Sequence, residues 1–136
     1  MTLEPMFKRM ARDFAEGNVA AVAAAFATPS VVYVGQKSLQ LTCPEDIQNA
    51  LGAYRKNLEV ESYAETEFDI SYQSPETNNR VQVLCNVTNR NERGAVISSF
   101  DASYILREDH DGRWRIVDHE ILPPIASRLA AGIALV

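Results

Sequence analysis

Residues 95–122 read AVISSFDASYILREDHDGRWRIVDHEIL and predict two long strands joined by a tight turn. Apolar and polar residues alternate from Val96 to Leu106, which is the period-two pattern of a strand with one more apolar face. The turn at residues 108–112 is polar and ends in Gly112, a residue that readily adopts a positive φ. We therefore expect this hairpin to carry the apolar face that the upstream elements cover.

The register of the hairpin decides which side chains share its apolar face. If Leu106 pairs with Trp114, that face also carries Asp118 and Glu120 at one end, because directly opposite side chains lie on the same face. A carboxylate on an apolar face is solvated, paired or functional. Solvation near a fraying strand end is the alternative interpretation. A slip of one residue would instead turn His119 inward.

Helices and shorter strands are predicted upstream of the hairpin. Apolar residues at helical spacing indicate three helices: the first ends at Gly17, and the second is capped by Asn18 and ended by Pro29. The third begins at a capping box of Thr42 and Glu45 and runs to about residue 58. Period-two runs and β-branched residues predict four more strands, at residues 30–34, 38–41, 63–72 and 80–88.

Length and composition indicate a single globular domain. The chain has 136 residues, of which 46% are hydrophobic, and a formal net charge of -5. The negative charge argues against nucleic-acid or anionic-membrane partners. Without a signal peptide or a membrane-length apolar run, and with only Cys43 and Cys85, we expect a cytoplasmic protein.

The last residues form a separate segment. We divide the chain into a domain at residues 1–122 and an apolar C-terminal tail at residues 123–136. Ile125, Leu129 and Ile133 fall on one helical stripe, so the tail is expected to be a packed helix.

The sequence lacks the motifs that are typical of several kinds of catalytic and metal site. There is no glycine-rich phosphate loop and no nucleophile elbow, and two histidines are too few for a zinc or iron site. Glu65, Glu67 and Asp69 alternate along one predicted strand, where a solvated outer face is favoured over a cation site. We therefore expect neither a cofactor nor a metal.

The order of elements resembles that of a known superfamily. The resemblance rests on residues 18–22 (NVAAV), 26–27 (FA), 31–32 (VV) and 111–119 (DGRWRIVDH). On these residues the chain resembles the nuclear transport factor two-like superfamily, and most closely its SnoaL-like and ketosteroid-isomerase-like bacterial members. The resemblance implies an α+β cone of cystatin-like topology, in which a curved mixed or antiparallel sheet wraps around three helices of the N-terminal half. It also implies a homodimer.

The chemistry of these relatives carries over only in part. The resemblance aligns Val34 with the general-base aspartate of ketosteroid isomerases, Met10 with their tyrosine and Tyr104 with their neutral acid, so that machinery is not expected here. SnoaL-like cyclases carry an acid on the last strand. Asp118 or Glu120 matches that position, and the resemblance implies a catalytic role for one of them.

Two functions remain open at this point. In the first, an isomerase-, cyclase- or dehydratase-type enzyme uses Asp118 or Glu120 as a base on a small apolar or aromatic molecule. In the second, the same fold is a non-catalytic ligand-binding or assembly module. The residues predicted to contact the ligand are aromatic ones, namely Tyr33, Tyr54, Phe100, Tyr104 and Trp114.

Overall fold

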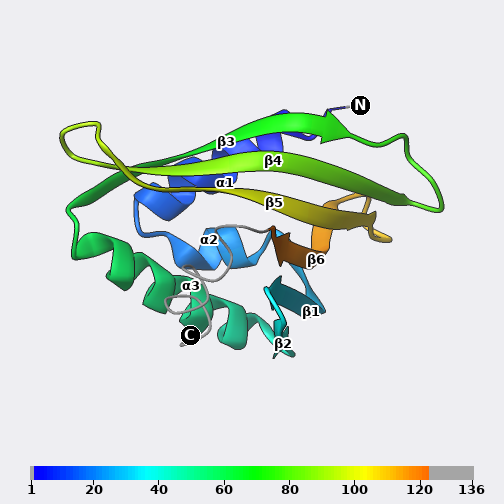
Figure 1. Cartoon of the computed structure of the whole chain (residues 1–136). Helices are drawn as coiled ribbons and strands as arrows, with labels where there is room; N and C mark the ends of the chain where they lie inside the picture. The colour runs from blue at the N-terminus through cyan, green and yellow to red at the C-terminus, as the bar shows by residue number, and fades with distance from the viewer. Residues whose placement is uncertain (1, 123–136) are drawn as a thin grey trace.

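The computed structural model describes residues 2–122, which form three helices and one six-stranded sheet (Figure 1). The helices are α1 (Glu4–Ala15), α2 (Val19–Ala23) and α3 (Pro44–Glu59). The strands are β1 (Phe26–Val34), β2 (Lys37–Leu41), β3 (Tyr63–Gln73), β4 (Arg80–Asn91), β5 (Val96–Glu108) and β6 (Trp114–Ile121). The predicted α+β fold with a curved mixed sheet around three helices is confirmed. The predicted tail helix at residues 123–136 lies outside the described residues.

The sheet has the strand order β2-β1-β6-β5-β4-β3 and is antiparallel except where β1 pairs with β6. This one parallel pair joins the N-terminal half of the chain to the end of the domain. All three helices lie on the same side of the sheet (Figure 1), so the opposite side is its outer face. Among the described residues, no helix is both long and apolar enough to cross a membrane.

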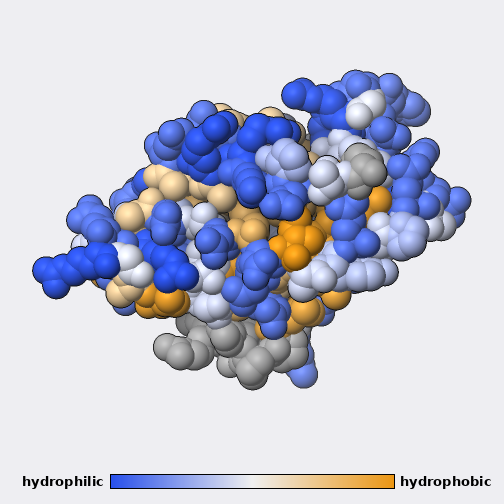
Figure 2. Space-filling view, turned by 90° about the horizontal axis from the view of Figure 1, so that it is seen from above, coloured by the Kyte–Doolittle hydropathy of each residue, from blue (hydrophilic) through white to orange (hydrophobic). Residues whose placement is uncertain are grey.

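The alternation predicted for the long strands is confirmed on β4 and β5. Val83 and Cys85 on β4 are buried, as are Phe100, Tyr104 and Leu106 on β5. These side chains form the main core together with Phe7 and Met10 of α1. Seen from above, the surface is mostly hydrophilic, and hydrophobic residues come to the surface near the middle of the view (Figure 2).

The second helix is shorter than the sequence predicts. It ends at Ala23, and β1 already begins at Phe26, so Pro29 lies within a strand and does not end a helix. The parallel pairing of β1 with β6 is irregular between Phe26 and Val31. A proline has no N–H to donate to a sheet, and this irregular stretch is where it can be accommodated. Pairing with β6 therefore overrides the helical spacing of residues 19–26.

The start of α3 also differs from the predicted capping box. Cys43 occupies the N-cap position, which makes Asp46 the third residue of the helix. The Asp46 carboxylate accepts hydrogen bonds from the Thr42 backbone N–H at 3.0 Å and from its hydroxyl at 2.8 Å. These bonds lower the pKa of Asp46. Glu45 is one position too early to take this role.

One arginine joins α3 to the end of α1. Arg55 donates from Nε to the Phe14 carbonyl at 2.8 Å and from Nη2 to the Ala15 carbonyl at 2.7 Å, and it also pairs with Glu59. The last carbonyls of a helix have no partner within that helix. The guanidinium gives the Ala15 carbonyl a partner and adds a second donor to the Phe14 carbonyl, which also accepts from the Gly17 N–H at 3.1 Å. It also interacts favourably with the helix dipole.

We predict that Arg55→Ala lowers the free energy of unfolding by about 2 kcal/mol, because two charge-assisted hydrogen bonds to helix-terminal carbonyls are lost. Urea unfolding followed by circular dichroism measures the change. Lys56→Ala is the matched control, since Lys56 is the neighbouring exposed cation on the same helix. Equal effects of the two substitutions would contradict the role assigned to Arg55.

Candidate functional site

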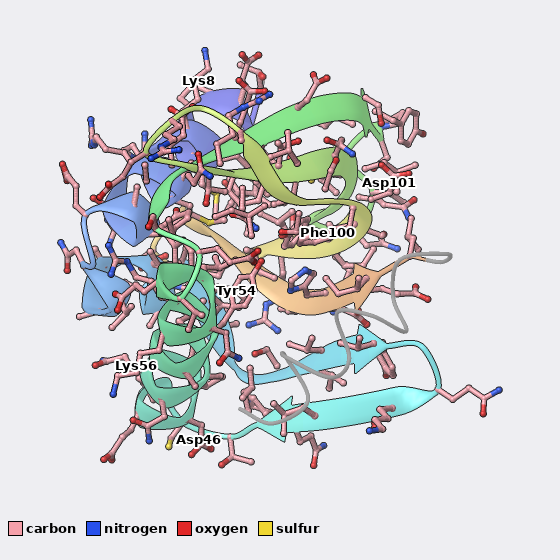
Figure 3. The ribbon with its side chains drawn as sticks, turned by 60° about the vertical axis from the view of Figure 1, so that its left-hand side comes forward. Lys8, Asp46, Tyr54, Lys56, Phe100 and Asp101 are labelled. Carbon is pink, nitrogen blue, oxygen red and sulfur yellow. The ribbon has the colours of Figure 1, made fainter. Side chains whose placement is uncertain are left out.

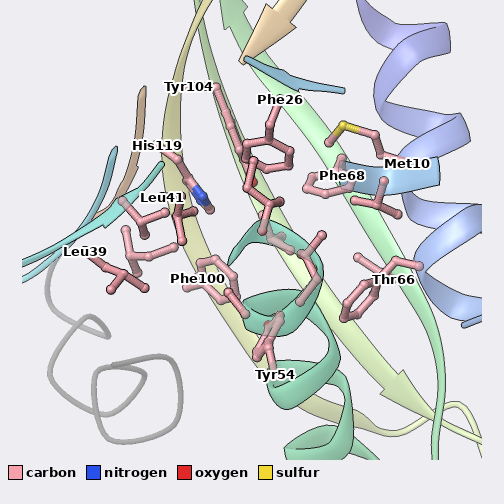
Figure 4. A pocket seen from close by; sticks show the side chains of 18 of the residues that line it. Met10, Phe26, Leu39, Leu41, Tyr54, Thr66, Phe68, Phe100, Tyr104 and His119 are labelled. Carbon is pink, nitrogen blue, oxygen red and sulfur yellow. The ribbon is translucent and has the colours of Figure 1, made fainter. Parts of the chain in front are cut away.

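An apolar cavity of about 110 Å³ lies between the inner face of the sheet and the helices. Every helix and every strand among the described residues contributes to its lining (Figure 4). Five of the lining residues carry polar side-chain atoms, and the others are apolar. The five are Tyr54, Thr66, Asn89, Tyr104 and His119.

A β-bulge in β6 sets which residues face this cavity. Leu106 pairs with Ile116, whereas the preceding residue of β5, Ile105, pairs with Asp118. Val117 is therefore the extra residue, and beyond it the side chains of β6 change faces. The predicted pairing of Leu106 with Trp114 is wrong. Beyond the bulge, the side chains of β6 lie on the opposite faces of the sheet from those predicted.

The bulge turns the predicted carboxylates away from the cavity. Asp118 and Glu120 pair with Ile105 and Ser103 on the outer face of the sheet, and neither lines the cavity. Partial burial raises the pKa of Asp118, and Glu120 is exposed. The expectation that these acids share the apolar face is wrong for a physical reason: one unpaired residue, Val117, changes the phase of the strand.

Three of the five predicted aromatic residues line the cavity, namely Tyr54, Phe100 and Tyr104. Tyr54 and Phe100 point into the space between α3 and the sheet, whereas Lys56 and Asp101 point outward (Figure 3). The other two predicted residues do not line it.

Tyr33 and Trp114 are the two predicted contacts that lie elsewhere. Val32 lines the cavity and Val34 is buried, so the alternation of β1 points the intervening Tyr33 outward, where it is 40% exposed. Trp114 packs against the main core and lines a separate surface cleft together with Arg113.

His119 occupies the place in the cavity lining that the sequence analysis assigned to a carboxylate. Its ring stacks on Tyr104 with centroids 4.2 Å apart and an angle of 16° between the planes. Its Nε2 atom is buried and has no hydrogen-bond partner among residues 2–122. Burial disfavours the imidazolium and lowers the pKa of His119 to about 4. The ring is therefore neutral at pH 7, with one nitrogen free in an apolar surrounding.

A second polar group in the lining was missed by the sequence analysis. Asn89 is 1% exposed and donates to the Tyr54 hydroxyl at 2.9 Å and to the Ser98 hydroxyl at 3.0 Å. It accepts from the Thr66 hydroxyl at 2.6 Å. The predicted strand ends at residue 88, although extending the alternation of β4 by one step past Val87 would have placed Asn89 on the inner face.

The titratable groups in the lining are all neutral at pH 7. Burial raises the pKa of Tyr54 to about 12, although the hydrogen bond from Asn89 works in the opposite direction. Burial also raises the pKa of Tyr104 well above its usual value. Among the described residues, no carboxylate, lysine or arginine lines the cavity. Across residues 2–122, no group of three or more histidine, cysteine or acidic side chains could hold a metal ion.

The fold and the cavity define a small α+β protein of cystatin-like topology, which agrees with the family comparison. The model of a family described as NTF2-like protein (DUF6841) matches residues 3–123. The chain belongs to this NTF2-like family, and the resemblance noted in the sequence is confirmed. No curated protein matches the chain.

Solved structures share the fold at low sequence identity. An NTF2-like protein with a cystatin-like fold from Novosphingobium aromaticivorans has a TM-score of 0.69 and 16% identity, over 98% of this chain and 86% of that one. A domain of unknown function from Nostoc punctiforme has a TM-score of 0.72 and 10% identity, over 95% and 80%. A ketosteroid isomerase-like protein from Erwinia carotovora atroseptica has a TM-score of 0.57 and 16% identity, over 83% and 88%. At these identities the likeness concerns the fold alone.

The depressed pKa of His119 predicts a pH dependence of stability. Between about pH 6.5 and the folded value of about 4, the unfolded chain binds a proton at this residue and the native protein does not. Stability should therefore fall as the pH falls through this window, by up to about 3 kcal/mol from His119 alone. Urea unfolding at several pH values, compared between the wild type and His119→Phe, measures this contribution.

The comparison isolates His119 because both proteins keep the remaining titratable groups. The raised pKa of Asp118 acts with the opposite sign, and the lowered pKa values of Asp109 and Asp111 act at lower pH. Parallel pH profiles for the wild type and His119→Phe would show that His119 titrates normally.

Proposed function

We propose that this protein binds a small, uncharged, apolar or aromatic molecule in the cavity, without a cofactor. The observation that carries the proposal is the lining: apolar side chains surround Tyr54, Tyr104 and His119, all of which are neutral at pH 7. An ion entering this space would lose its hydration and gain no opposite charge, which costs several kcal/mol. A neutral apolar molecule gains burial of its surface instead.

The size of the cavity suggests a ligand built around a single ring. A dry apolar cavity of about 150 Å³ in another protein binds benzene, and the volume here is about 110 Å³. Aromatic side chains from β1, β3 and β5 offer ring faces and edges for such a ligand. They are Phe26, Phe68 and Phe100.

An isomerase, cyclase or dehydratase remains a prediction with less support. Asp118 and Glu120, the predicted bases, lie outside the cavity lining. The basic group inside is His119, and a pKa of about 4 makes it a weak proton acceptor at neutral pH. Binding without turnover is therefore the better-supported function.

We also propose a cytoplasmic location, which the free thiols of Cys43 and Cys85 support.

We further propose the homodimer that the resemblance implies, with the outer face of the sheet as its interface. The middle of that face on β4 and β5 is uncharged, and Asp118 and Glu120 lie beside it on β6. It carries the half-buried Leu84 and Ile105 and the polar, largely buried Thr88 and Ser103. Low charge is typical of the core of a protein interface.

The dimer proposal predicts a solution mass of twice the 15.1 kDa of the chain by light scattering. Ile105→Glu should give a monomer, because it adds a second carboxylate directly beside Asp118 at the centre of the interface. Gln36→Lys, in the β1–β2 turn, is the control that should stay dimeric. A monomeric wild type, or dimers from both variants, would contradict the proposed interface.

The ligand proposal predicts that the protein binds benzene and excludes benzoate, because the carboxylate would lose its hydration and meet no positive charge among the described lining residues. Ala50→Leu should weaken benzene binding by roughly tenfold or more, since the added carbon atoms occupy much of the space. Ala53→Leu is the matched control on α3, because Ala53 does not line the cavity. Titration followed by protein NMR measures each affinity.

Asp118→Asn separates this proposal from the carboxylate hypothesis. It should leave benzene binding unchanged, because Asp118 lies on the outer face. Loss of binding in Asp118→Asn, or equal binding of benzoate and benzene, would contradict the proposed function.

A further inference from the structure

The hydrogen bonds around Asn89 have a direction that follows from the atoms they join, because an amide oxygen only accepts and an amide nitrogen only donates. Thr66 Oγ1 lies 2.6 Å from Asn89 Oδ1, which suits an O–H···O bond. Asn89 Nδ2 lies 2.9 Å from the Tyr54 oxygen and 3.0 Å from the Ser98 oxygen, which are ordinary N–H···O lengths. The amide oxygen therefore accepts from Thr66, and the amide nitrogen donates one hydrogen to each of the other two hydroxyls.

The direction of donation can be followed through the whole hydrogen-bond network, from Tyr63 to Tyr54. Thr66 has one hydroxyl hydrogen and donates it to Asn89, so the hydrogen between Tyr63 and Thr66, whose oxygens lie 2.5 Å apart, belongs to Tyr63. Donation then runs from Tyr63 through Thr66 and Asn89 to the oxygen of Tyr54. The hydroxyl hydrogen of Tyr54 has no acceptor among residues 2–122. The network ends in a donor that is not used.

This free donor belongs to the cavity. Tyr54 extends from α3 into the lining, close to Phe100 and on the side of the cavity where Thr66 lies (Figure 4). Its ring stacks on Phe14, with centroids 5.6 Å apart and 28° between the planes. The stacking and the Asn89 bond hold the hydroxyl in place. Bonds in such a chain polarise one another, which makes the terminal O–H a better donor.

We propose that Tyr54 donates its hydroxyl hydrogen to the ligand, and that the cavity therefore selects small neutral molecules that carry a hydrogen-bond acceptor, such as a ketone, lactone or ether oxygen. The inference rests on the proposed function, because it names the class of ligand for that cavity. A ligand with an acceptor gains a hydrogen bond from this donor and a ligand without one does not, so the site favours acceptor-bearing ligands.

Three uncharged ring compounds test the inference. Cyclopentanone only accepts a hydrogen bond, pyrrole only donates one through its N–H, and benzene has no polar group. Affinities for the wild type and Tyr54→Phe are measured by protein NMR titration. We expect the substitution to weaken cyclopentanone binding by roughly three- to tenfold, the worth of one neutral hydrogen bond, and to change pyrrole and benzene by less than about twofold. Tyr72→Phe, on exposed Tyr72 of β3, should change none of the three.

The outcomes separate the inference from the proposed function. If the wild type binds none of the three, both fall. If benzene binds but Tyr54→Phe leaves cyclopentanone unchanged, the inference is overturned and the ligand cavity stands. If Tyr54→Phe weakens pyrrole instead, Tyr54 donates to Asn89 and presents an acceptor to the ligand, which also overturns the inference.

A second measurement does not depend on the folding of the Tyr54→Phe variant. The carbonyl ¹³C resonance of labelled cyclopentanone bound to the wild type should lie downfield of its position in cyclohexane, because hydrogen bonding polarises the carbonyl group. A bound resonance at the cyclohexane position would overturn the inference.

Discussion

The pairing of β5 with β6, interrupted by the bulge at Val117, is the constraint on which the cavity depends. Before the bulge, Ile116 shares the inner face with Leu106; after it, His119 pairs with Tyr104. Ile121 then comes to lie inside, only 1% exposed. Without the bulge, the same strand would turn Asp118 inward against an apolar core, at a cost of several kcal/mol for an unpaired carboxylate. One unpaired residue therefore keeps the acids of β6 outside and its apolar end inside.

The parallel pairing of β1 with β6 completes the enclosure. It brings β1 and β2 beside the hairpin, so that Val32, Leu39 and Leu41 can line the cavity opposite the long strands. Helix α3 then lies across this space and is joined to the end of α1 by Arg55. Residues far apart in the sequence thus line one small volume. The resulting low polarity explains why the titratable groups inside are neutral.

Membership of the NTF2-like family describes the fold and leaves the chemistry to the side chains. Over residues 2–122 the lining contains a neutral histidine, two tyrosines and the Asn89 network, and it contains no carboxylate. The acid of the last strand, which the resemblance to SnoaL-like cyclases implies for Asp118 or Glu120, is displaced to the outer face. A cavity of this kind selects ligands by their shape, their lack of charge and a few hydrogen bonds. The fold alone does not determine which ligands meet these conditions.

Much of the fold could be predicted because it follows from local patterns. Alternation along residues 96–106 identifies the inner face of β5, and helical spacing with Gly17 identifies α1. Tyr54, Phe100 and Tyr104 were predicted as cavity residues because each lies on a face that its own element defines. For such residues, periodicity and burial point in the same direction.

The remaining features depended on partners distant in the sequence. Where α2 ends and β1 begins is decided by pairing with β6, which the helical spacing of residues 19–26 does not encode. Asn89 acquires its role only when Tyr54 and Thr66, from two other elements, meet it. The sequence by itself determined the elements and most of their faces, because these depend on residues a few positions apart. Only the tertiary structure decided the phase of β6, and with it whether His119 or Asp118 faces the cavity, because a bulge is a property of two paired strands.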